Sequence, residues 1–247
     1  ISFITFTLIS YVVDVYKGLF QIEKQVKWLL GYILFFPQLI AGPILRPSQL
    51  LPQLKKNQPR HRRLWITGLT IFTLGLVKKL IFADQISRTI DPIYAAPDMF
   101  TSWELWLAVW GFTVQIYCDF SGYTDMAIGL GFLLGVKLPQ NFQQPYSAAS
   151  IGEFWQRWHI TLSTWLRDYI YIPLGGSRNR AGKTFRNLMI TMLIGGLWHG
   201  ASWNFLIWGI YHGFFLIIER IFLKNILSKI GDWCSLAYCF FITVLGW

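Results

Sequence analysis

Several apolar runs in this sequence are long enough to cross a lipid bilayer, and no other feature constrains the fold as much. A spanning helix needs about 20 apolar residues. Residues 64–83 and 103–120 approach or meet that length, and residues 188–218 exceed it. Lipid offers no hydrogen-bond partners to the backbone, so such runs must fold as helices. The sequence therefore predicts an all-α fold, a polytopic transmembrane helical bundle with re-entrant and interfacial amphipathic helices.

Composition and charge favour the same class. Hydrophobic residues make up 54% of the 247 residues and charged residues 14%, against about 25% charged in soluble domains. A net charge of +10 would suggest nucleic acid as the partner of a soluble protein. Here the basic residues fall between the apolar runs, as in cytoplasmic loops that face anionic headgroups. We expect membrane lipid as a partner, and no nucleic acid.

The chain is expected to be a piece of a longer protein. It starts at Ile1 without a signal peptide and stops within an apolar run, residues 236–247. We expect a single membrane domain over residues 1–247, truncated at both ends. Its three cysteines have no metal-type spacing and lie in apolar stretches, which predicts buried, inert thiols.

The segments between the apolar runs differ in charge and in glycine and proline content. Residues 28–45 are apolar but contain two prolines, so they should be buried in protein or re-entrant. Residues 46–63 are predicted to form a basic cytoplasmic loop, and residues 84–102 an acidic external loop. The Gly-rich stretch 122–136 is expected not to complete a crossing, because this places residues 137–186 on the cytoplasmic side.

Residues 150–171 are predicted to form one amphipathic helix in the membrane interface. Ser150 and Glu153 have the spacing of a capping box. At helical periodicity one face is polar (Glu153, Arg157, Thr161, Thr164, Asp168) and the other apolar (Phe154, Trp158, Leu162, Trp165, Tyr169). His159 lies at the edge of the polar face.

His199 is the first candidate for a catalytic residue. It lies in the middle of residues 188–218, where glycines predict a break in the helix. An ionisable residue deep in an apolar segment is costly to bury and indicates function. Imidazole titrates near neutrality and can accept a proton from a hydroxyl. Small neighbours leave room for a substrate, and Trp198 supplies a wall. The alternative is a histidine that packs between helices.

Other histidines and polar residues carry weaker signals. His159 is either an interface residue or a second catalytic group. Asn204 and Ser202 follow His199 closely and could orient it, or could serve as polar contacts between helices. His212 is expected to be a packing residue.

Two carboxylates lie in or beside an apolar run. Asp119 and Asp125 would be costly in the membrane unless paired, so each should meet a partner such as Arg157 or Arg167. We interpret them as structural or channel-lining. The sequence has no metal-spaced His/Cys cluster, Gly-rich phosphate loop or serine nucleophile elbow, so no metal and no bound cofactor are expected.

Four strings resemble motifs of the membrane-bound O-acyltransferase (MBOAT) family. They are residues 117–125 (YCDFSGYTD), 154–163 (FWQRWHITLS), 167–176 (RDYIYIPLGG) and 196–205 (GLWHGASWNF), and residues 36–44 (FPQLIAGPI) also fit the pattern. Within the family the chain looks most like the bacterial alginate O-acetyltransferase branch, which includes peptidoglycan and cellulose acetylation relatives. The string at residues 172–176 (IPLGG) favours that branch over the D-alanyl transferase of teichoic acids.

The resemblance implies the MBOAT fold, with His199 as the family's essential histidine and His159 as its second motif histidine. It implies a tunnel for the substrates, where Asn204, Trp198, Asp119, Asp125 and Arg157 are candidates for lining or orienting roles. It further implies a multi-pass protein of the bacterial inner membrane, an acyl donor such as acetyl-CoA or another thioester on the cytoplasmic side, and an extracytoplasmic acetyltransferase or acceptor protein and a polysaccharide as partners.

These features predict acyl transfer from a thioester to a hydroxyl. His199 would act as general base or would form an acyl-histidine. Acetyl transfer to an exported, alginate-like or other cell-surface polysaccharide is favoured. The alternatives are D-alanyl or other acyl transfer to a cell-envelope polymer, and a non-catalytic membrane component of a polysaccharide secretion complex.

Overall fold

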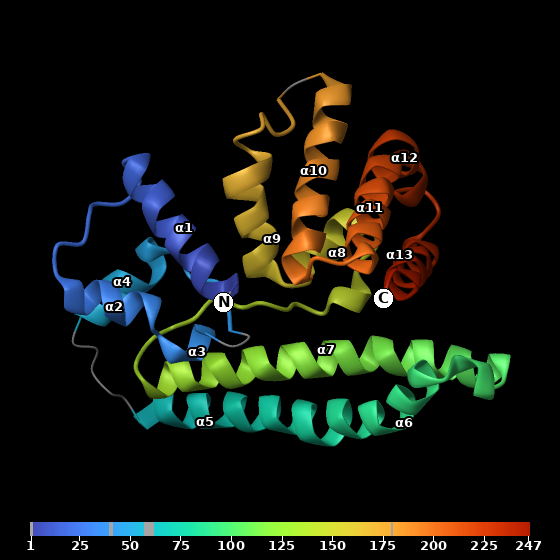
Figure 1. The fold of residues 1–247 in the computed structure, drawn as a ribbon, viewed down its shortest axis with the longest axis horizontal. Helices are drawn as coiled ribbons and strands as arrows, with labels where there is room; N and C mark the ends of the chain where they lie inside the picture. Colours follow the sequence, from blue (N-terminus) through green and yellow to red (C-terminus); the bar gives the residue numbers. More distant parts are fainter. Residues whose placement is uncertain (1, 40–41, 57–61, 179) are drawn as a thin grey trace. The chain divides into compact units, whose positions relative to one another are not determined.

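The computed structural model describes residues 2–39, 42–56, 62–178 and 180–247, and within these ranges it contains helices and no strand (Figure 1). The prediction of an all-α fold is confirmed. The described chain forms two compact units, unit 1 (Ile1–Gln140) and unit 2 (Asn141–Trp247). Each contains one continuous helical stretch that is long and apolar enough to cross a membrane, Arg62–Ala95 in unit 1 and Trp203–Leu227 in unit 2.

A pair of long helical segments dominates unit 1. α5 (Arg62–Val77) continues through a π-helical turn (Lys78–Ala83) into α6 (Asp84–Ala95), and α7 (Ser102–Leu133) runs alongside (Figure 1). The prediction of an acidic loop at residues 84–102 is wrong for most of its length. Its aspartates are spaced seven residues apart, which places Asp84 and Asp91 on one face of α6.

Four glycines explain why α5 and α7 pack so closely. A Cβ atom added at Gly68 would lie 2.8 Å from the carbonyl oxygen of Gly129, and one added at Gly75 would lie 2.6 Å from that of Gly122. Small residues at such crossings let helix backbones approach each other. α7 runs through the Gly-rich stretch to Leu133, so that residues 103–133 belong to one helix and not to two segments.

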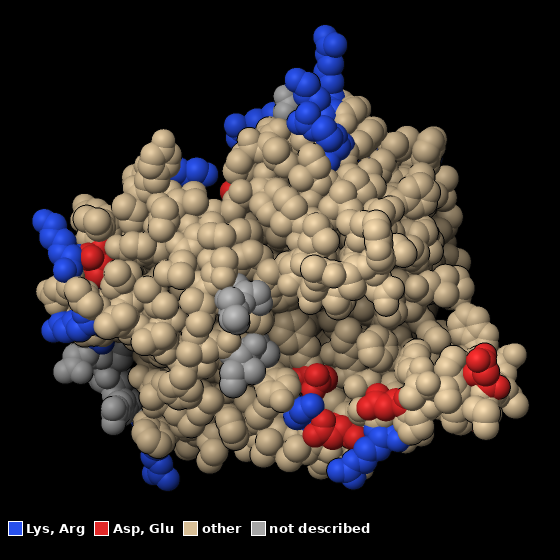
Figure 2. Space-filling model, in the orientation of Figure 1, with Lys and Arg blue, Asp and Glu red and all other residues tan. Residues whose placement is uncertain are grey.

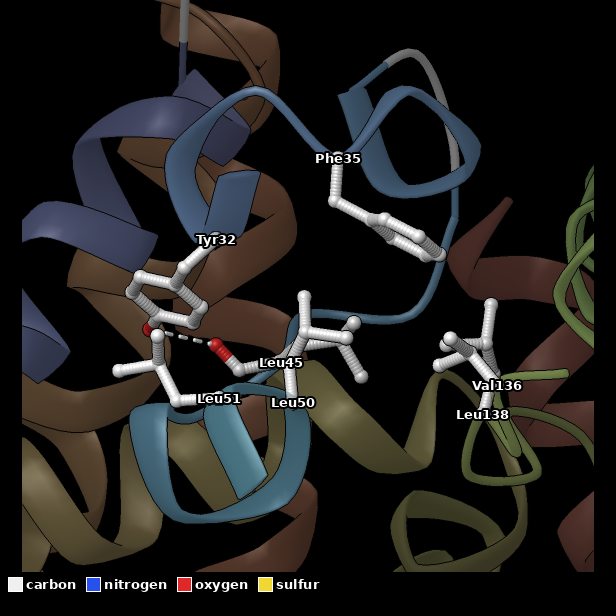
Figure 3. Close-up of a cluster of buried hydrophobic side chains, with 7 residues drawn as sticks. All are labelled: Tyr32, Phe35, Leu45, Leu50, Leu51, Val136 and Leu138. Carbon is white, nitrogen blue, oxygen red and sulfur yellow. Dashed lines mark hydrogen bonds between the residues drawn. The ribbon is translucent and has the colours of Figure 1, made fainter. Parts of the chain in front are cut away.

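The rest of unit 1 packs around a small apolar core (Figure 3). The core joins α2 (Val26–Ile33), α4 (Pro47–Lys55) and the segment that follows α7 through a cluster of buried side chains: Tyr32, Phe35, Leu45, Leu50, Leu51, Val136 and Leu138. The Tyr32 hydroxyl donates to the carbonyl oxygen of Leu45 at 3.0 Å. The predicted loop at residues 46–63 therefore contains a helix, α4, whose apolar side covers this core. Residues 57–61 of that loop lie outside the described chain.

The segment of residues 28–45 is broken, as its prolines predict. α2 ends at Ile33, and α3 (Phe36–Leu39) is a single turn in which Pro37 and Gln38 are buried. The Gln38 side-chain amide donates to the carbonyl oxygen of Tyr32 at 2.8 Å. The described part of this segment is thus partly buried in protein, which is one of the two predicted arrangements.

Unit 2 consists of short helices followed by longer ones. α8 (Ile151–Arg157), α9 (Ile160–Leu166) and a π-helical turn (Arg167–Tyr171) lead to α10 (Ala181–His199) and α11 (Trp203–Ile218). A π-helical turn (Glu219–Leu223), α12 (Lys224–Leu227) and α13 (Asp232–Gly246) complete the unit (Figure 1). Cys239 is buried on α13 but Cys234 is exposed, so the prediction that all three thiols are buried is wrong for Cys234.

The prediction of one amphipathic helix at residues 150–171 is wrong. The helix breaks at His159, whose φ of 43° lies in the left-handed region. The break turns both segments inward, so that His159 and Thr161 are buried although the periodicity placed them at the edge and on the polar face. The apolar positions Phe154, Trp158 and Leu162 are buried as predicted.

Candidate active site

His199 is the last residue of α10. The chain leaves the helix at Gly200, which is extended, and α11 begins at Trp203. The predicted break in the middle of residues 188–218 is confirmed. The break turns the chain back, so that α10 and α11 pack against each other.

Glycines hold the two helices close to each other near His199. A Cβ atom added at Gly196 would collide with the carbonyl oxygen of Phe205, and one added at Gly209 would lie 2.7 Å from that of Met192. The close crossing brings the first turns of α11 beside the last turn of α10. His199 therefore lies next to side chains that follow it by six and nine residues.

Three aromatic rings surround part of the His199 imidazole. The ring centroid of Trp198 is 4.8 Å away, and that of Trp208 lies 5.2 Å away at an interplanar angle of 76°. Phe205 stacks at 5.6 Å with an interplanar angle of 28°. Although these rings cover part of it, His199 as a whole residue is exposed. Such surroundings exclude water from one side of the ring and leave the other side open to a reactant.

His159 also lies next to Trp198. Its ring centroid is 5.9 Å from that of Trp198, and only 1% of the residue is exposed. Its Nδ1 atom lies 3.2 Å from Oδ1 of Asn141. Burial lowers the pKa of His159 to about 3, with the neighbouring His199 acting in the same direction, so the imidazole is neutral at physiological pH.

The two histidines selected from the sequence are thus brought together around Trp198, which was predicted to form a wall. Asn204 is exposed in the first turn of α11. Its role in orienting His199 stays a prediction.

A cavity adjoins this group of rings. It has a volume of ≈ 210 Å³ and lies among α8, α9, the following π-helical turn, α10 and α11. Trp155 and Trp208 form part of its wall, and their rings are 5.5 Å apart. Arg167 and Tyr171 also line it, whereas most of the other lining residues are apolar. Trp208 belongs both to the cavity wall and to the surroundings of His199.

Asp119 and Asp125 are paired with lysines, and the expectation of Arg157 or Arg167 is wrong. Lys79 Nζ lies 2.6 Å from Asp119 and 2.7 Å from Asp84, and Lys78 Nζ lies 2.6 Å from Asp125. All these groups belong to the paired helical segments of unit 1, along which acidic and basic side chains gather (Figure 2). The signal missed in the sequence was Lys78-Lys79 in the middle of an apolar run, because charges there require partners as well.

The two arginines have partners close to them in sequence. Arg157 donates to Glu153 at 2.5 Å and to the Ser147 hydroxyl at 2.8 Å. Arg167 donates from Nε to Asp168 at 2.7 Å. These contacts give Arg157 a structural role on α8, and its assignment as a tunnel residue stays a prediction.

His212 is packed as predicted. It is fully buried on α11, with Trp155 at 5.1 Å and Trp208 at 4.8 Å between ring centroids. The sequence reasoning missed Trp155, Trp208 and Asn141, which come from separate segments and contact the two other histidines or their neighbours. Trp155 lies within a recognised motif, whereas Asn141 had no local signal.

The fold is all-helical in the described residues, contains membrane-length apolar helices and brings two histidines together around Trp198. These features are those of a helical membrane protein whose candidate site is centred on histidine. The chain belongs to the MBOAT, or membrane-bound O-acyltransferase, family, whose model matches residues 23–243. Within the described ranges no group of three or more His, Cys, Asp or Glu side chains is arranged to hold a metal ion.

Individual relatives are similar over most of this chain. A protein of Azotobacter vinelandii named probable alginate O-acetylase is 45% identical over 247 residues, which is 100% of this chain and 49% of that protein. The peptidoglycan O-acetyltransferase of Helicobacter pylori is 40% identical over 249 residues, covering 90% of this chain and 47% of that protein. The teichoic acid D-alanyltransferase of Bacillus subtilis is 28% identical over 233 residues, covering 91% of this chain and 59% of that protein. The chain therefore spans about half the length of the first two relatives.

Proposed function

We propose that the full-length protein is a multi-pass O-acyltransferase of the bacterial inner membrane. It transfers an acetyl group from a cytoplasmic thioester donor towards a hydroxyl of an exported cell-surface polysaccharide, alginate-like or other. The observation that carries the proposal is His199 at a helix break, partly walled by aromatic rings, with a second histidine next to the same Trp198 ring. Greater identity to the acetyl-transferring relatives than to the D-alanyl one favours acetyl.

In the proposed reaction the acceptor hydroxyl gives its proton to the His199 imidazole as its oxygen attacks the thioester carbonyl. The carbon–oxygen bond of the new ester forms, the carbon–sulfur bond breaks, and the thiolate takes the proton back from the imidazolium. General base action typically gives a 10²–10⁴-fold acceleration. Positioning of the two reactants supplies much of the remainder. His159 orients a substrate or relays a proton.

The donor is proposed to be acetyl-CoA or another acyl thioester. The ≈ 210 Å³ cavity is largely apolar and shares Trp208 with the surroundings of His199, which suits the uncharged arm of a thioester. Lys and Arg side chains gather over the N-terminal end of α10 (Figure 2), where Arg178, Lys183 and Arg186 are exposed. They would attract the phosphates of coenzyme A.

The partners are proposed to lie on the opposite side of the membrane. An extracytoplasmic acetyltransferase or acceptor protein takes the acetyl group and passes it to the polysaccharide. This assignment rests on the family and on the names of two relatives, which give alginate and peptidoglycan as the polymers that are acetylated.

Replacing His199 with Ala in the full-length protein tests the proposal. Acetyl esters on surface polysaccharide, measured by mass spectrometry, should disappear while the amount of protein in the membrane is unchanged. The control is Cys234→Ala, at an exposed position on α13, which should retain full acetylation. Retained acetylation in His199→Ala would remove His199 from the mechanism.

D-alanyl transfer is the second candidate, because the chain is also 28% identical to a teichoic acid D-alanyltransferase. The same mass spectra distinguish the two, because a D-alanyl ester adds an amine that an acetyl ester lacks. Accumulation of aminoacyl esters that depends on His199 would replace the acetyl assignment.

A further inference from the structure

Asn141 makes an unusual number of contacts with the segment that carries His159. Its backbone carbonyl accepts a hydrogen bond from the backbone N–H of Ile160 at 2.9 Å. Its side-chain Oδ1 accepts from the backbone N–H of Thr161 at 3.0 Å and from the Thr161 hydroxyl at 2.8 Å. The same oxygen lies 3.2 Å from Nδ1 of His159. Asn141 is fully buried.

These contacts stabilise a backbone conformation that is costly by itself. His159 has φ 43° and ψ 54°, a left-handed conformation that non-glycine residues rarely adopt. The bonds from Asn141 to the two following residues compensate for that cost. The αL break between α8 and α9 therefore depends on a residue 18 positions earlier in the chain.

The same contacts determine which nitrogen of His159 carries the proton. A backbone N–H can only donate, so the Asn141 atom that faces Thr161 must be the amide oxygen and not the amide nitrogen. An amide oxygen can only accept, so Nδ1 of His159, at 3.2 Å from it, must be the donor. In the neutral ring the other nitrogen, Nε2, is then the unprotonated one.

We propose that Asn141 is a positioning residue that holds His159 in the Nδ1–H tautomer, so that Nε2 is the proton-accepting nitrogen of this ring. The proposed catalytic use of that nitrogen, as a proton relay or as an acceptor of a hydrogen bond from a substrate, rests on the proposed function. The tautomer itself does not, because it follows from contacts within unit 2. A fixed tautomer matters because the wrong one disables a histidine in acid–base catalysis.

The tautomer can be measured directly by nitrogen NMR of the full-length protein with ¹⁵N-labelled histidine. Residues 1–247 contain four histidines. The signals that disappear in His159→Gln are those of His159. We expect a protonated Nδ1 and an unprotonated Nε2 in the wild-type protein. An Nε2–H signal for His159 would overturn the proposal.

Variants test whether Asn141 is the cause. Asn141→Asp keeps an acceptor oxygen and should keep the proton on Nδ1, whereas Asn141→Leu should shift protonation towards Nε2 and lower acyl transfer at least about 10-fold. Thr161→Val is the matched control, since it removes one donor to the same oxygen but leaves the His159 contact. It should keep the tautomer.

An unchanged tautomer in a folded Asn141→Leu protein, or a changed one in Thr161→Val, would overturn the assignment. If Asn141→Leu does not fold, the wild-type and Asn141→Asp spectra still show which nitrogen of His159 carries the proton. Loss of transfer in His199→Ala and the tautomer of His159 are measured separately, so failure of the proposed function is distinguishable from failure of this inference.

Discussion

Replacing Gly209 with Ala should reduce acyl transfer without preventing membrane insertion. The added Cβ atom would lie 2.7 Å from the carbonyl oxygen of Met192 and 3.1 Å from Cα of Leu193, both on α10. These atoms belong to backbone, so rotation of a side chain cannot relieve the contact. α10 and α11 must move apart by about 0.7 Å to restore an ordinary contact of 3.4 Å.

That displacement acts on the candidate site because Trp208 precedes Gly209 and packs against His199. Misplacement of reacting groups by about 1 Å can lower the rate about 10²-fold, so a shift of this size should lower it by roughly 10- to 100-fold. Overpacking costs about 1–3 kcal/mol, and the higher helix propensity of Ala offsets about 1 kcal/mol of it. Net destabilisation of about 0–2 kcal/mol is therefore expected.

The assay compares acetyl ester content of surface polysaccharide with the thermal unfolding midpoint of the detergent-solubilised full-length protein. Gly182→Ala is the matched control, because Gly182 also lies on α10 but a Cβ atom added there has no neighbour within 4 Å. The control should retain full transfer and gain up to about 1 kcal/mol in stability. Wild-type transfer by Gly209→Ala would refute the link between the helix crossing and the site.

Three further predictions concern charged and titratable groups. Lys79→Met leaves both Asp119 and Asp84 without their shared lysine and should lower stability by about 1–3 kcal/mol, and the double variant with Asp119→Leu should recover part of the loss in thermal unfolding. His159 has a pKa of about 3 when folded and about 6.5 when unfolded, so its own contribution to stability should be complete well above pH 6.5 and fall by about 2 kcal/mol at pH 5. His159→Gln should lack this component, and an equal pH dependence of its unfolding midpoint would contradict the burial of a neutral ring. The Glu219 carboxylate accepts from the backbone N–H of Ile151 at 2.7 Å, so Glu219→Ala should cost about 1–2 kcal/mol, whereas Glu219→Gln, which keeps one acceptor, should cost less in the same measurement.

Local patterns in the sequence were sufficient for the fold class and for the choice of histidines. Apolar runs must become helices in lipid whatever their neighbours are, and glycines beside His199 predicted the break that the structure shows at Gly200. His199 could be selected because an ionisable group in an apolar run is informative by itself. His212 was expected to pack between helices instead, and the structure buries it fully.

Contacts between distant segments could not be predicted in this way. Asp119 pairs with Lys79, 40 positions earlier in the chain, because glycines bring α5 and α7 close enough to align these charges. The left-handed break at His159 overrides a regular amphipathic periodicity, since Asn141 supplies hydrogen bonds that a continuous helix could not use.

The sequence alone determined that this chain forms membrane-length helices interrupted at His199, because burial of backbone and of apolar side chains follows from each segment's own composition. Only the tertiary structure decided which polar groups meet, and with them the inward turn and the proton position of His159. Hydrogen bonds and ion pairs form between atoms that folding brings within about 3 Å, and no local pattern encodes that proximity.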